Sequence, residues 1–240
     1  MTGISLIHRS LVYMFTRKAM YFFSLIYVLL ILAFSFSSHL EILFHIGSWF
    51  WLAWITYFVI HDRRGERPGI MSSFFKSIEL MFKGWWLLAF LIGSQLFVDY
   101  VYYALPKTTE SLIYYLTGNA LLVVAPFFIL PLLMDDITRC FPVIRYCWFE
   151  IKHGFYALVV YFIALLPLSL VLFALVAGVL LVISTLFNLT CGIWFPQVYC
   201  ISIPPYVGNF IVYQVSRSLS FLFVAVSQSI FYQTMIYGRD

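Results

Sequence analysis

The chain has 240 residues, of which 63% are hydrophobic and only 10% are charged. A soluble domain carries roughly 25% charged residues, so this composition argues against a soluble globular protein and predicts a protein dissolved in lipid. The formal net charge of +4 is small, and the charged residues stand at the ends of apolar runs. A nucleic-acid-binding protein needs a basic face or stripe, so we expect no nucleic-acid partner.

Long apolar runs predict six transmembrane helices, because a helix crosses the hydrocarbon core in about 20 residues. The six runs are Ala19–Phe36, Ile42–Ile60, Trp85–Ala104, Leu112–Met134, Phe155–Leu181 and Phe210–Ile236. Apolar and polar residues do not alternate along them, which argues against barrel strands. We therefore expect an all-α, polytopic membrane protein that forms one integral membrane domain over residues 1–240.

Lysine and arginine are distributed unequally between the two sides of this six-span arrangement. Of the 14 Lys and Arg residues, Lys107 falls on one side, Arg217 lies within a span, and the rest fall on the other side. Basic residues beside a span resist translocation, and the side that carries them faces the cytoplasm. The distribution predicts that both termini are cytoplasmic.

A short basic amphipathic stretch followed by an apolar hairpin occurs three times. The stretches start near Ile7, Phe75 and Ile144. The three repeats cover approximately residues 5–64, 72–139 and 141–240. Such stretches can lie in the membrane interface, apolar face down, before the chain turns into a span. Each hairpin ends in charged residues, which either stop transfer across the membrane or contact lipid headgroups.

Asp99 and Arg217 are charged residues within the apolar runs. At 1.5 Å per residue they lie roughly 7 Å and roughly 11 Å inside the outer ends of the third and sixth spans. A charge at such depth is costly unless it is paired or hydrated. The two residues form a structural ion pair, or share a functional polar pocket, or extend separately toward the outer surface.

The sixth run carries further polar residues. Gln214, Arg217, Ser218 and Gln228 share one helical face by their spacing, and Gln95 in the third run can join them. Two interpretations remain open for this face: hydrogen bonds between helices inside the bundle, or a polar conduit.

The segment Val182–Asn209 is expected to be the longest loop on the outer side, and it holds Cys191 and Cys200. An oxidising compartment would permit a disulfide between them, and the alternative is two buried thiols. Glu41 and His45 have a spacing that can hold a metal if helical, but polar residues at a span boundary are usually only solvated. We expect no metal site and no cofactor.

The stretches Phe75–Trp86 and Ile144–Phe155 and the closing segment Tyr232–Asp240 carry a resemblance. Their layout resembles bacterial six-span inner-membrane families, namely the YciC-like proteins and the membrane domain joined to some glycerophosphodiester phosphodiesterases. The resemblance implies a location in the inner membrane and a role in membrane homeostasis or trafficking. The soluble hydrolase domain is absent from this sequence, so the resemblance transfers no catalytic residue.

The sequence contains no HExxH, G-x-S-x-G, P-loop or G-x-G-x-x-G motif. We expect a non-enzymatic integral inner-membrane protein with a scaffolding, assembly or membrane-homeostasis role, whose partners are membrane lipids and other membrane proteins. The alternative is a small transporter or permease subunit with a polar site near Asp99 and Arg217. Internal repeats and proline-containing helices occur in transporters, but parallel hairpins lack the inverted symmetry common there.

Overall fold

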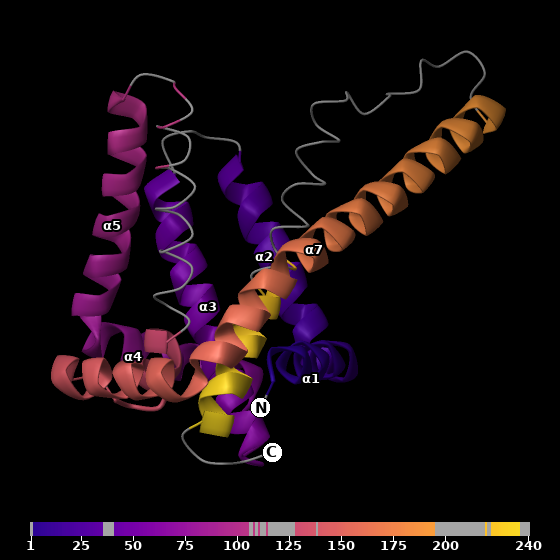
Figure 1. Ribbon diagram of the computed structural model, residues 1–240. Coiled ribbons are helices and arrows are strands. Elements are labelled where there is room, and N and C mark those ends of the chain that lie inside the picture. Colours follow the sequence, from indigo (N-terminus) through magenta and orange to yellow (C-terminus); the bar gives the residue numbers. More distant parts are fainter. Residues whose placement is uncertain are drawn as a thin grey trace.

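A computed structural model describes residues 2–35, 41–105, 108, 110, 114, 128–137, 139–194, 219 and 222–235. Every regular element among these residues is helical, which confirms the predicted all-α fold class. Figure 1 shows two sets of helices: short segments that lie crosswise in one layer at one end of the molecule, and longer helices that rise from this layer.

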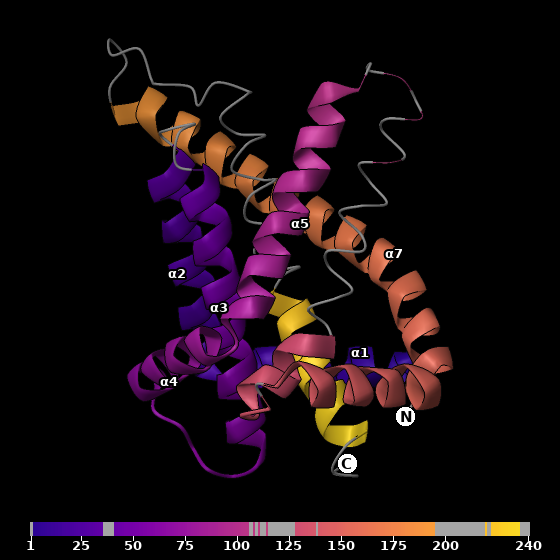
Figure 2. The ribbon, with the colours of Figure 1, turned by 90° about the vertical axis from the view of Figure 1, so that its left-hand side faces the viewer.

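Three amphipathic segments make up the crosswise layer, which we call the belt. They are α1 (Gly3–Thr16), α4 (Ile70–Lys83) and the first part of α7, Pro142–Phe149. Figure 2, turned by 90°, shows them again at one level, so the layer is not an effect of the viewing direction. These are the stretches in which the sequence predicted amphipathic helices.

Each belt segment turns directly into an apolar helix. A single extended residue, Arg17, separates α1 from α2 (Lys18–Ser35). Gly84 separates α4 from α5 (Trp85–Ala104), and the chain bends there by 76°. The third segment belongs to α7 (Cys140–Trp194), which bends by 66° after Phe149. The belt therefore meets the rising helices at steep angles.

The bounds of the rising helices follow the predicted apolar runs closely, with one exception. α2, α3 (Glu41–Arg63) and α5 cover the first three runs. The expectation that a loop begins at Val182 is wrong, because α7 remains helical as far as Trp194. No proline stands between Pro167 and Pro196, so the sequence holds no strong breaker that would end the helix at residue 181.

Taken singly, none of the described helices combines the length and the apolarity that a membrane crossing requires. Two bent pairs meet both requirements together: Ile70–Lys83 with Trp85–Val98, and Pro142–Phe149 with Lys152–Leu165. The six-span arrangement therefore stays a prediction.

Many buried residues of the described core lie in three segments, α3, residues 128–134 and helix 222–235, and the other helices pack against them. A helix with a single apolar face exposes the residues of its opposite face, yet residues 222–233 are all buried, as expected of a helix surrounded by others. Two indole N–H groups bind α3 to its neighbours: Trp51 donates to the Phe23 carbonyl in α2, and Trp54 donates to the Ile70 carbonyl in α4, both at 3.0 Å.

Candidate functional site

The residues that the sequence singled out fall largely outside what the structure describes. Gln95 and Asp99 lie in α5, and their side chains are not among those described. Gln214 and Arg217 lie outside the described residues. The proposed pairing of Asp99 with Arg217 therefore stays a prediction.

The side chains of the two cysteines of the predicted disulfide are also not described. Cys191 lies in the last turn of α7, and its side chain is not described. Cys200 lies outside the described residues. Because α7 continues to Trp194, Cys191 stands at the end of a helix and not within the loop that the sequence predicted.

Gln228 is the described member of the predicted polar face, and it is 1% exposed. Its amide donates to the Thr56 hydroxyl of α3 at 2.7 Å. The preceding residue, Ser227, donates to the Ser10 hydroxyl of α1 at 2.9 Å. A buried polar group without a partner is costly, so these bonds let helix 222–235 present polar side chains inside the bundle. They connect helices within the bundle.

A junction of charged and polar side chains lies where the three hairpins end. The Arg64 guanidinium, just after α3, lies 2.6 Å from Asp135, which follows helical residues 128–134. Tyr232 of the third hairpin donates to the other Asp135 oxygen at 2.6 Å. The Arg64 and Asp135 side chains are only 16% and 9% exposed. One carboxylate thus binds the ends of the other two hairpins.

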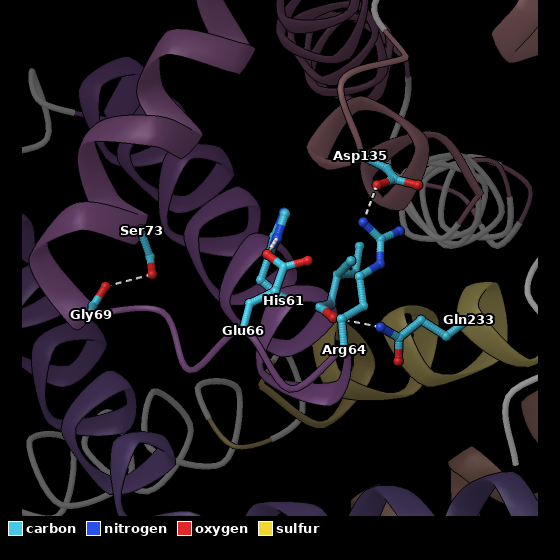
Figure 3. A network of polar contacts seen from close by, with 8 residues as sticks. His61, Arg64, Glu66, Gly69, Ser73, Asp135 and Gln233 are labelled. Atoms are coloured by element: carbon cyan, nitrogen blue, oxygen red, sulfur yellow. Dashed lines mark hydrogen bonds and ion pairs between the residues drawn. The ribbon is translucent and has the colours of Figure 1, made fainter.

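Figure 3 shows this junction, with Arg64 pointing toward Asp135 while Gln233 approaches from helix 222–235. The Gln233 amide donates to the Ile60 carbonyl at 2.5 Å. In the same view His61 pairs with Glu66 across the turn that leaves α3. Gly65 has a φ of +84° in this turn, a conformation that glycine adopts without steric cost.

A second carboxylate, Asp62, holds α1 to the end of α3. It accepts a hydrogen bond from Tyr13 at 2.7 Å, and the Arg17 Nε atom lies 3.1 Å from the same oxygen. Burial, followed by the hydrogen bond to Asp62, raises the pKa of Tyr13. The phenol therefore stays a neutral donor in the physiological pH range.

Beside Asp62 the surface forms a basic pocket of about 440 Å³. It is lined by His8, Arg9, Val12, Tyr13, Thr16, Arg17 and Arg63. Burial, and then the positive charge of Arg9, lower the pKa of Arg63. Among these lining residues there is no acidic side chain, so the pocket concentrates positive charge between α1 and the end of α3.

The α4 segment of the belt has three distinct faces. Ser73, Ser77 and Leu80 are buried against the bundle. Met71, Phe75 and Phe82 share a second face by their spacing, and each is at least 60% exposed. By helical spacing Ser73 and Ser77 are grouped with Lys76 and Lys83, opposite the apolar residues, and this grouping predicts that both serines face water. That grouping is wrong, because both hydroxyls bind carbonyls of their own chain segment and so can be buried.

The third face of α4 is charged. Lys76 and Lys83 lie 2.8 Å and 2.9 Å from the Glu79 carboxylate. Hydrogen bonds from these two lysines lower the pKa of Glu79 to about 2. The Glu79 side chain is 48% exposed, and exposed ion pairs of this kind add little stability. We interpret this face as the solvated side of the belt.

The charged residues described here are arranged as structural connections and as a basic surface. Within the described part of the chain there is no group of three His, Cys, Asp or Glu residues that could hold a metal ion. Comparisons with protein-family models, with curated proteins and with solved structures give no match. The resemblance to the six-span inner-membrane families therefore stays an expectation.

Sequence reasoning missed the partners of Asp62 and Asp135. The sequence does show both aspartates as acidic residues within otherwise basic segments. Asp62 is followed by two arginines, and Asp135 is followed by Asp136. Composition predicts only that such residues end an apolar run. It does not reveal that Asp135 receives both Arg64 and Tyr232, because that depends on how three distant chain segments pack.

Proposed function

We propose that this chain is a non-enzymatic integral membrane protein with a scaffolding, assembly or membrane-homeostasis role, located in a bacterial inner membrane with both termini in the cytoplasm. The observation that carries the proposal is the belt: three amphipathic helices in one layer, each running into an apolar helix that leaves the layer on the same side (Figures 1 and 2).

Exposed apolar side chains on the rising helices support a lipid environment. Phe97 and Tyr100 of α5 are 62% and 72% exposed, and Leu25 of α2 and Leu175 of α7 are each more than half exposed. A soluble monomer rarely exposes apolar patches larger than a few hundred Å². Hydrocarbon chains would cover these side chains without any further protein.

The belt supports a location at the membrane surface. The exposed apolar face of α4 has counterparts in Ile4 and Phe15 of α1 and in Ile144 and Trp148 of α7. A helix with a buried, an apolar and a charged face can pack on the bundle, enter the acyl boundary and contact water at once.

The scaffolding role is favoured over transport because the described polar groups form hydrogen bonds between helices. The polar side chains of helix 222–235 form hydrogen bonds with other helices, as Ser227, Gln228 and Gln233 show. Transport would require a polar site around Asp99 and Arg217, and it remains the alternative that an experiment must separate.

Topology can be tested by labelling single cysteines in a background whose four native cysteines are serine. We expect Glu110→Cys, beyond the end of α5, to react with a membrane-impermeant maleimide in intact spheroplasts. Glu66→Cys, in the turn after α3, should react only after permeabilisation. Labelling of both positions from the same side would overturn the proposed membrane arrangement.

The role itself can be tested by cross-linking in native membranes, followed by purification and identification of the proteins and lipids recovered. A scaffold is expected to recover a reproducible protein partner, and Asp99→Asn should leave that recovery unchanged. A transporter would instead show solute uptake in proteoliposomes that Asp99→Asn abolishes. Uptake with no partner would refute the scaffolding proposal.

A further inference from the structure

The basic pocket between α1 and the end of α3 has a composition suited to a phosphate group. Arginine presents a planar fork of donors that matches phosphate oxygens, and Arg9, Arg17 and Arg63 all line the pocket. Its volume of about 440 Å³ lies within the range of roughly 300–1,000 Å³ that is usual for small-ligand sites.

The nearest described carboxylate is already occupied by groups of the protein. Asp62 binds the Tyr13 hydroxyl and the Nε atom of Arg17. Arg17 still has its two Nη groups outside that bond, and its side chain is 52% exposed. Asp62 therefore holds Arg17 at the edge of the pocket with donors available for a ligand.

Arg63 is held in the pocket under conditions that disfavour its charge. Burial and the neighbouring positive charge of Arg9 both lower its pKa. An anion between Arg9 and Arg63 would relieve this repulsion, because opposite charges at short distance favour the ionised form of each. An anion in this pocket would therefore stabilise the charged form of Arg63.

The pocket also has an apolar edge. Val12 lines it and is 47% exposed, and Phe15, one turn further along α1, is 67% exposed. Both side chains belong to the belt, the layer that the proposed function places at the membrane surface. A ligand that combines a phosphate with hydrocarbon chains would use the arginines and this edge together.

We propose that the pocket binds the headgroup phosphate of an anionic phospholipid. This inference rests on the proposed membrane location, and it adds a specific lipid site to it. A soluble phosphate compound shares the chemistry of the headgroup, and the experiment below separates the two sources.

The test measures lipid binding to purified protein in detergent by native mass spectrometry. Dioleoylphosphatidylglycerol is expected to bind at least about tenfold more tightly than dioleoylphosphatidylcholine. Arg63→Gln and Arg9→Gln should each weaken phosphatidylglycerol binding by about fivefold, the effect of removing one basic residue near an anionic lipid surface. Two variants are used so that the test survives if one of them fails to fold.

Arg145→Gln is the matched control, because Arg145 is an exposed arginine in the belt segment of α7 and lies outside the pocket. It makes the same change in net charge, and we expect phosphatidylglycerol binding within twofold of the unmodified protein. An equal loss in Arg145→Gln and Arg63→Gln would show a diffuse basic surface and overturn the site. Unchanged binding in both pocket variants would overturn it as well.

Sodium phosphate added as a competitor identifies the source of the phosphate. We expect 10-fold molar excess of phosphate over lipid to leave phosphatidylglycerol bound, since phosphate lacks the chains that contact the apolar edge. Complete displacement would assign the pocket to a soluble phosphate and overturn the lipid ligand. These outcomes are independent of the cysteine labelling, so failure of the lipid site and failure of the membrane arrangement are distinguished.

Discussion

Asp135 contacts residues at the ends of the other two predicted hairpins. Its carboxylate pairs with Arg64 and accepts the hydrogen bond of Tyr232, while both charged side chains are largely buried. Removing one partner of a buried ion pair is costly, because the remaining charge loses its compensation. We expect Asp135→Asn to lower the apparent melting temperature in detergent by about 5–10 °C, which corresponds to a few kcal/mol in a protein of this size.

The adjacent Asp136 provides a matched control for this prediction. Its side chain is 69% exposed, and its nearest cation, Lys83, lies 3.9 Å away. Exposed pairs contribute little, so Asp136→Asn should melt within about 1 °C of the unmodified protein. If both variants melted alike, the Asp135 junction would not stabilise the bundle.

At this scale the sequence predicts the kind of residue but not its partner. The charged residues at the ends of the apolar runs are visible in the sequence, and they are the basis of the predicted orientation in a membrane. The choice of Asp135 as acceptor for both Arg64 and Tyr232 was not predicted. It arises only when segments 97 residues apart are brought together.

Among the elements, α1 and α7 approach each other closely at Gly3. A Cβ atom added at Gly3 would lie 2.6 Å from both the Ala157 carbonyl oxygen and the Tyr161 backbone nitrogen. Backbone atoms of a helix cannot move aside as a flexible side chain can. Gly3→Ala should therefore separate the helices and cost about 1–3 kcal/mol, as overpacked cores do. Thermal unfolding in detergent would measure this loss.

Gly178, later in α7, gives the control for Gly3→Ala. A Cβ atom there would meet nothing within 4 Å. Alanine is favoured over glycine inside a helix by roughly 0.5–1 kcal/mol, so Gly178→Ala should leave the melting temperature unchanged or raise it slightly. A neutral Gly3→Ala variant would contradict the close packing of α1 on α7.

The elements themselves were predicted well where one periodicity governs them. The apolar runs predicted the bounds of α2, α3 and α5 to within a few residues. Each run ends at charged residues, at Gly84 or at the start of a polar turn. The end of α7 was missed because hydropathy falls after Leu181 without a breaker of the helix. The burial of Ser73 and Ser77 was missed because a hydroxyl that binds its own backbone behaves as a small buried side chain.

For the whole molecule, the chain closes on itself at the belt. The first helix, α1, and the last described helix, 222–235, lie side by side at this end (Figures 1 and 2), and Ser10 and Ser227 connect them. Local periodicity cannot predict such a contact, because the contact depends on the path of the whole chain between these two helices. The closure explains how long helices with exposed apolar sides are held together at one end.

This closure predicts a specific disulfide. The Ser10 and Ser227 hydroxyl oxygens are 2.9 Å apart, and both residues are buried. With the native cysteines replaced by serine, Ser10→Cys with Ser227→Cys should form an intramolecular disulfide on mild oxidation, because cysteine sulfurs at these positions fall within bonding reach after a small rotation. The product would migrate faster than the reduced chain in a denaturing gel.

Ser5→Cys with Ser227→Cys is the control, since Ser5 caps the start of α1 through Thr2 and lies on a different face of the helix. Equal cross-linking in both pairs, or cross-links only between separate molecules, would show that the first and last helices do not pack as described.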